Sequence, residues 1–90
     1  MRIKSLKVTV TLHNIRRGLI LHRMSCPIAL AVRRATHRTN VSVSGTTIYA
    51  GKSAFALPQK AINFIDDFDY GDHVTPFTFT ARRIEFPWKL

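Results

Sequence analysis

The first stretch of the chain alternates between apolar and polar residues. Across Lys4–Leu12 the apolar positions are Leu6, Val8, Val10 and Leu12, and polar residues separate them. A period of two residues puts all of these apolar side chains on one side of an extended backbone. The pattern therefore predicts a β-strand with one buried face.

A short helical turn and an irregular link are expected next. The turn spans His13–Gly18, with Thr11 or His13 preceding it and Gly18 closing it in a left-handed conformation. Residues 19–24 mix apolar and charged side chains without a regular period. They predict a link that leads the chain into its main helix.

The stretch Ser25–Thr36 contains the start and the end of that helix. Ser25 is a favourable N-cap, and Pro27 fits the first turn because its missing N–H costs nothing there. Arg33 and Arg34 occupy the last turn, where the helix dipole favours cations. The apolar residues recur at helical spacing and predict one small face that packs closely on a sheet. They are Ile28, Ala29, Ala31, Val32 and Ala35.

The middle of the chain predicts a three-stranded meander, or a hairpin with one further short strand. Its extended segments are residues 41–43, Thr46–Ala50 and Ser53–Leu57, which are rich in β-forming residues or alternate in polarity. Turn residues at Gly45 and Gly51 separate them.

A second helix is predicted over Pro58–Asp69, because a proline opens it and apolar residues recur at helical spacing. Its apolar stripe consists of Ala61, Ile62, Ile65 and Phe68, with Phe64 at the margin. The helix ends in carboxylates, which oppose its dipole. We therefore expect a basic neighbour, a solvated turn or a partner beside them, and Gly71 to end the helix.

The last strand is predicted over Val74–Ile84, where Phe77, Phe79 and Ala81 alternate with polar residues. Pro76 belongs at the start of this strand or on an edge, because it has no N–H to donate. The patterns together predict one α+β domain over residues 1–90. We expect a small antiparallel sheet with two main helices packed on one face.

Length and composition fit a folded domain of modest size. The chain has 90 residues, of which 46% are hydrophobic. Its longest apolar run, Ile28–Val32, is too short to span a bilayer, and no signal peptide opens the chain. A single cysteine, Cys26, excludes an internal disulfide framework. We expect a cytoplasmic protein that binds no cofactor and no membrane.

The charge of +9 is distributed unevenly. Residues 1–60 contain eleven lysines and arginines and no acid, whereas residues 61–90 contain three basic residues and five acids. A block without carboxylates creates a positive field that attracts nucleic acid, an anionic membrane or an acidic protein, although charge can also serve solubility alone.

Six arginines are the predicted contacts to phosphate or to acidic groups of a partner. They are Arg16, Arg17, Arg23, Arg33, Arg34 and Arg38. The pair Arg82-Arg83, with Lys52 and Lys60, extends the same basic set. Few aromatic residues interleave with it, which disfavours base stacking and leaves contact with the phosphate backbone.

The candidates for catalysis and metal binding carry little specific signal. Cys26 would begin the main helix, where the dipole lowers a thiol pKa, but no spacing puts a histidine beside it. Its alternative role is that of a small buried side chain. The acidic run 66–72 resembles the start of a calcium loop, yet Phe77 stands where the bidentate glutamate belongs. We therefore predict no catalytic residue and no metal site.

The C-terminal segment ends in Phe86, Pro87 and Trp88. Phe86 and Trp88 serve either as packing residues or as an exposed anchor for a protein partner, since aromatic residues dominate interface hot spots.

The order of these motifs resembles that of short phage and bacterial proteins of unknown activity. The segments CPIA, at residues 26–29, and PFTF, at residues 76–79, carry the resemblance, which covers residues 8–80. It implies a phage accessory protein that acts in the host cytoplasm by binding host machinery, and it transfers no functional residue.

The sequence thus leads to a non-enzymatic binding protein that contacts nucleic acid or a nucleoprotein complex. The alternatives are a protein-binding inhibitor or a virion or assembly subunit that uses the aromatic tail, and a small enzyme that uses Cys26.

Overall fold

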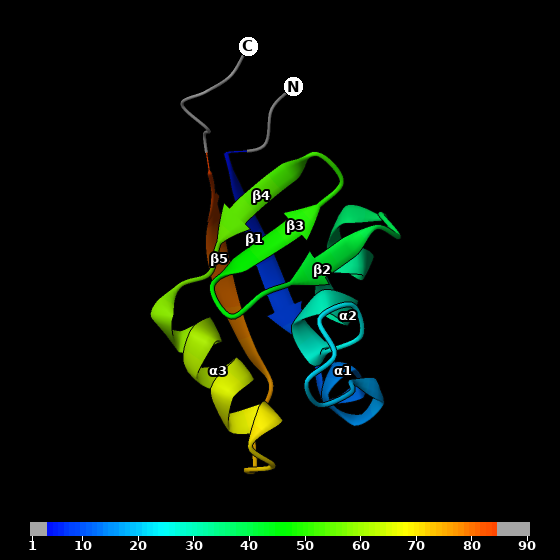
Figure 1. Ribbon diagram of the computed structural model, residues 1–90, viewed down its shortest axis with the longest axis vertical. Helices are drawn as coiled ribbons and strands as arrows, with labels where there is room; N and C mark the ends of the chain where they lie inside the picture. Colours follow the sequence, from blue (N-terminus) through cyan, green and yellow to red (C-terminus); the bar gives the residue numbers. More distant parts are fainter. Residues whose placement is uncertain (1–3, 85–90) are drawn as a thin grey trace.

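The computed structural model describes residues 4–84, which form a five-stranded antiparallel sheet and three helices (Figure 1). The strands are β1 (Ser5–Val10), β2 (Val41–Val43), β3 (Thr47–Ala50), β4 (Ser53–Ala56) and β5 (Phe77–Arg83). The helices are α1 (Leu12–Arg17), α2 (Pro27–Thr36) and α3 (Gln59–Asp69). The strand order is β1-β5-β4-β3-β2. The predicted α+β class and the predicted meander are confirmed.

The first and last strands of the sheet, β1 and β5, lie side by side although they are far apart in sequence. Leu6 faces Ala81, and Val8 faces Phe79. Because strand side chains alternate, one register aligns the apolar sides of both strands. The same register turns the polar residues of both strands toward solvent.

One hydrophobic cluster joins the inner face of the sheet to both longer helices. From α2, Ile28 and Val32 are completely buried. From α3, Phe64 packs its ring against Phe77, with 4.8 Å between the ring centroids. The prediction of two helices over one sheet face is confirmed, but Phe64 lies in the core and not at the margin of its helix.

Helix α1 begins earlier than predicted and ends differently. Leu12 belongs to this helix and is 47% exposed, so it does not continue the buried face of β1. Thr11 caps the helix, and its side chain and that of Asn14 form reciprocal bonds with each other's backbone N–H. Gly18 has φ −72°, so the predicted left-handed closure is wrong. A β-carbon on Gly18 would lie 2.5 Å from Cδ of Pro27, so the position needs glycine for close packing.

The main helix α2 is capped by Cys26 and not by Ser25. The Sγ of Cys26 accepts a hydrogen bond from the N–H of Ala29 at 3.4 Å. Ala35, predicted on the apolar face, is exposed, because the sheet contacts only the first two turns fully. His37 ends the helix in a left-handed conformation.

Of two boundaries near the C-terminal side, one agrees with the prediction and one differs. Helix α3 is followed by Gly71 with φ +88°, which agrees with the predicted end signal. Strand β5 begins at Phe77, after Pro76, so residues 74–76 are not part of the ladder. Within residues 4–84, every helix is too short or too polar to cross a membrane.

Candidate binding surfaces

The six predicted arginines are dispersed over the molecule, and Arg33 lies in the last turn of α2. Arg17 and Arg34 line one groove together, and Arg23 lines a different one. Arg38 packs against Gly51 in the turn between β3 and β4. Arg16 lies exposed in the last turn of α1. The structure thus brings together one pair, from separate helices, and disperses the rest.

Two of these arginines also hold the fold together. Arg33 donates from Nη2 to the carbonyl of Met24. Arg34 donates from Nη2 to the carbonyl of Thr9 at 2.7 Å and from Nη1 to Oδ1 of Asn14 at 3.3 Å. These bonds fix both guanidinium groups, so their freedom to follow a mobile partner is reduced. Within residues 4–84, no hydrogen bond uses the guanidinium group of Arg16, Arg17 or Arg23.

A groove of about 430 Å³ lies where α1 meets α2. Its cations are Arg17 from the last turn of α1 and Arg34 from the last turn of α2, and its apolar part is formed by Leu19 and Leu30. Asn14, only 4% exposed, forms part of the lining and orients Arg34. Positive charge and apolar surface therefore meet in one concave site.

The loop between α1 and α2 is tied to the rest of the protein at several points. Leu21 donates its N–H to Oδ1 of Asp69 at 2.9 Å. The carbonyl of Arg23 accepts the N–H of Val43 at 2.8 Å, and within the loop itself the carbonyl of Ser25 accepts the N–H of Leu19 at 2.9 Å. The sequence predicts a basic neighbour, a solvated turn or a partner beside the acidic end of α3. At Asp69 the neighbour is the backbone N–H of Leu21 and not an arginine side chain.

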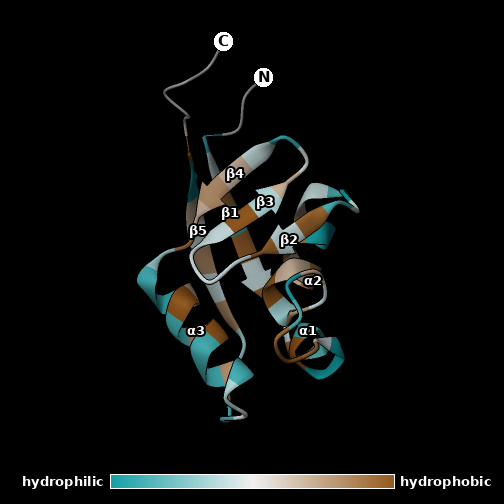
Figure 2. Cartoon of the chain, in the orientation of Figure 1, coloured by the Kyte–Doolittle hydropathy of each residue, from teal (hydrophilic) through white to brown (hydrophobic). Residues whose placement is uncertain are grey.

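This fixed loop exposes large aliphatic side chains. Figure 2 shows hydrophobic residues, coloured brown, in the loop between α1 and α2. Leu21 is 80% exposed, and half or more of Leu19 and Ile20 is exposed. Leu12 on α1 and Met24 near the end of the loop are almost as exposed. We call these five residues, together with Arg16, Arg17 and Arg23, the α1–α2 surface.

The outer face of the sheet is a second cationic surface of different composition. Across β1 and β5, Ser5 pairs with Arg82, Lys7 with Thr80, and Thr9 with Thr78. None of the five strands contains an acidic residue. Tyr49 on β3 projects from the same face and is 42% exposed. We call the exposed polar and aromatic residues of this face the sheet surface; they are Ser5, Lys7, Thr9, Tyr49, Thr80 and Arg82.

The side chain of Cys26 is buried and caps helix α2. It is 6% exposed, and burial raises the pKa of its thiol, although the bond from Ala29 opposes this effect. The sequence-based expectation of a pKa lowered by the helix dipole is therefore wrong, because desolvation outweighs the N-terminal amides. The thiol also lines a groove of about 200 Å³ that includes His22 and Asp69, but no hydrogen bond within residues 4–84 links it to either.

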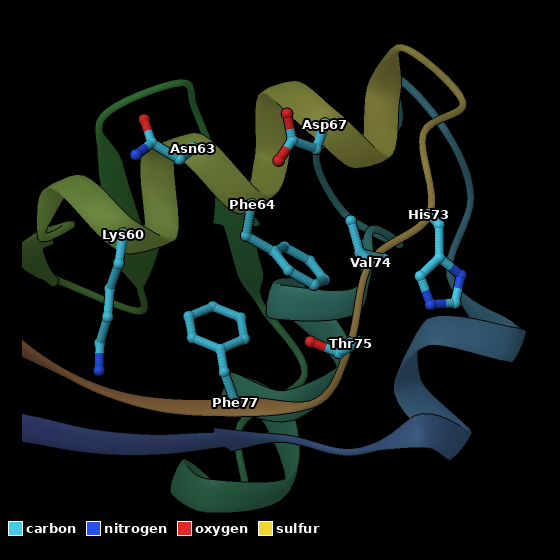
Figure 3. Close-up of a pocket in the computed structure, with 8 residues that line it drawn as sticks. All are labelled: Lys60, Asn63, Phe64, Asp67, His73, Val74, Thr75 and Phe77. Carbon is cyan, nitrogen blue, oxygen red and sulfur yellow. The ribbon is translucent and has the colours of Figure 1, made fainter.

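A third groove, of about 270 Å³, separates α3 from the segment before β5 (Figure 3). The rings of Phe64 and Phe77 face each other in it, and Lys60 and Asp67 project from α3. The imidazole of His73 does not point toward the carboxylate of Asp67. Within the described part of the chain, no group of three or more His, Cys, Asp or Glu side chains could hold a metal ion.

Some residues of both surfaces were not singled out from the sequence. Arg82 was named only as part of the pair Arg82-Arg83, and Lys7 was not named as a contact, although the period-two signal of a strand exterior could have identified it. The aliphatic run Leu19-Ile20-Leu21 had no such signal, because exposure in an irregular segment depends on what covers it. Phe86 and Trp88 lie outside the described residues.

Comparison of the chain with protein-family models, with curated proteins and with solved structures gave no match.

Proposed function

We propose that this chain is a small non-enzymatic protein that binds nucleic acid, alone or within a nucleoprotein complex, through its sheet surface. The observation that carries the proposal is the composition of that surface. Lys7 and Arg82 stand among hydroxyl groups on strands that contain no carboxylate. Cations and hydroxyl donors are the groups that contact phosphate oxygens.

The segregation of charge supports the same function. Residues 4–60 contain ten lysines and arginines and no acid, whereas the four acids of the described chain lie between Asp66 and Asp72. The exposed Arg16, Arg23 and Arg38 add to the positive field beyond the sheet. Such a field accelerates association with a polyanion and favours contact at any sequence.

Tyr49 offers one feature beyond backbone contact. It is an exposed aromatic ring on the same face as the cations. A ring of this kind stacks on an unpaired base, so the proposal favours a single strand over a duplex of the same charge. A role as a phage accessory protein in the host cytoplasm, which the resemblance implies, is part of this proposal.

The test is binding of a fluorescent single strand and of a duplex of mixed sequence at about 50–200 mM salt, where phosphate contacts are revealed. We expect a steep loss of affinity with salt, and Lys7→Gln and Arg82→Gln each to reduce the salt slope by about one. Lys60→Gln is the matched control, because it removes one exposed cation from α3 and not from the sheet. A flat salt response, or equal effects of all three variants, contradicts the proposal.

A further inference from the structure

The α1–α2 surface has features that nucleic-acid binding does not require. Five of its eight exposed side chains are apolar, and none of its members is aromatic. Contiguous apolar surface among polar residues marks sites of interaction with proteins or membranes. Phosphate contact would gain nothing from Leu19, Ile20 and Leu21.

The exposure of these residues is a property of an ordered loop. Leu21 has φ +56°, a conformation that costs free energy for a branched side chain, and its N–H is held by Asp69. Arg33 holds the carbonyl of Met24 from the other side. The fold therefore maintains Leu21 in a position where it is 80% exposed.

The groove beside this loop contains two arginine side chains that can bind an anionic group. Arg34 is oriented by Thr9 and Asn14, with further N–H donors left over from a guanidinium that has five. Arg17 lines the groove from α1, and its guanidinium group makes no hydrogen bond within residues 4–84. Leu19 and Leu30 supply apolar surface in the same groove.

From charge complementarity, we propose that the α1–α2 surface binds an acidic segment of a partner protein that is rich in aliphatic residues. One carboxylate lies between Arg17 and Arg34, where two guanidinium groups can hydrogen-bond its oxygens. An aliphatic side chain next to that carboxylate packs on Leu19 and Leu30, and further ones cover the exposed loop. This function goes beyond nucleic-acid binding and uses a different surface.

Three other occupants fit less well. A lipid bilayer is flat and does not enter a groove between two helices. Nucleic acid leaves the aliphatic side chains without a partner. A second copy that used the same surface symmetrically would bring Arg16, Arg17 and Arg23 against their own equivalents.

The test uses a display library of random peptides selected on the full chain. We expect enriched peptides to combine aspartate or glutamate with a neighbouring leucine, isoleucine, valine or methionine. Arg17→Glu and Leu19→Ser should each weaken a selected peptide roughly tenfold or more. Both side chains are exposed, so the variants are expected to fold. Lys7→Glu is the matched control, because it makes the same charge change on the sheet surface.

The outcomes separate this proposal from the nucleic-acid function. Peptide binding that is lost in Arg17→Glu and kept in Lys7→Glu supports the proposal, whatever the nucleic-acid assay gives. No enrichment, enrichment without acidic residues, or equal peptide binding by all variants overturns it. So does a Leu19→Ser defect confined to anionic vesicles, to single-stranded nucleic acid, or to self-association of the chain.

Discussion

The sheet surface and the α1–α2 surface have the same sign of charge but different neighbours around that charge. On the sheet, Lys7 and Arg82 lie among hydroxyl groups. On the helical side, Arg17 shares a groove with Leu19 and Leu30, and Arg23 lines another groove with Leu21 and the carboxylates of Asp66 and Asp69. Charge alone draws any anionic partner, so the uncharged neighbours decide which class of partner is held.

The two surfaces also differ in how they are built. The sheet surface follows from β pairing, because the register that buries Val8 against Phe79 turns Lys7 and Thr80 outward together. The α1–α2 surface depends on a few specific contacts, among them Gly18 against Pro27 and Leu21 with Asp69. We therefore expect the first to tolerate local change and the second to be lost through single substitutions.

The largest loss of stability is expected in the hydrophobic core, on which both surfaces depend. Phe79 is 2% exposed, stands opposite Val8 and stacks near Phe77. Phe79→Ala should lower the free energy of unfolding by about 3–5 kcal/mol, because it leaves a cavity in the core, and should abolish both binding activities. Urea denaturation measures the change.

The control is the next residue along the strand. Thr80→Ala alters an exposed side chain and should change stability by no more than about 0.5 kcal/mol. A comparable loss in both variants would mean that the alternation along β5 does not define the core.

A smaller and more selective effect is expected at Gly18. Gly18→Ala introduces a β-carbon where only 2.5 Å separates it from Cδ of Pro27, so α1 must move away from α2. Overpacking of this kind costs about 1–3 kcal/mol. The selected acidic peptide should bind more weakly, while nucleic-acid binding at the sheet stays unchanged; fluorescence anisotropy follows both.

Gly45→Ala is the matched control, since a β-carbon at Gly45 meets no atom within 4 Å. Equal effects of the two substitutions on peptide binding would show that the fit between Gly18 and Pro27 does not shape the α1–α2 surface.

The smallest effect concerns Cys26, which caps α2 and lines the groove beside Arg23. Because burial raises its pKa, alkylation at neutral pH should be slower in the folded protein than in urea. A thiol that holds its proton more tightly when folded stabilises the protein below the unfolded pKa, about 8.5. Stability should therefore decline as pH rises from there through the folded pKa.

Cys26→Ser tests the same residue from the structural side. A hydroxyl can accept the N–H of Ala29 in place of Sγ, so the cap should survive and the part of the pH decline due to the thiol should disappear. If the folded wild-type protein is alkylated faster than the unfolded chain, the thiol is reactive. That result would favour the alternative hypothesis of an enzyme that uses Cys26.

The local patterns of the sequence determined the elements and their faces. The alternation around Val8 and Phe79, the helical spacing in α2 and the turn residue Gly45 each act over a few residues, and each predicted its element correctly. One error concerns the start of α2: the pattern predicts Ser25 as the N-cap, whereas the structure uses Cys26, whose Sγ accepts the N–H of Ala29.

Only the tertiary structure decided how the elements meet. It placed β1 beside β5, moved Phe64 from the margin of a helix into the core, and brought Arg17 and Arg34 to one groove. It also gave Asp69 the amide of Leu21 as its partner. Such contacts join residues that are distant in sequence, and their free energy depends on burial and geometry that no local period encodes. Both proposed binding surfaces therefore depend on the tertiary structure, although the positive charge that they share could be read from the sequence.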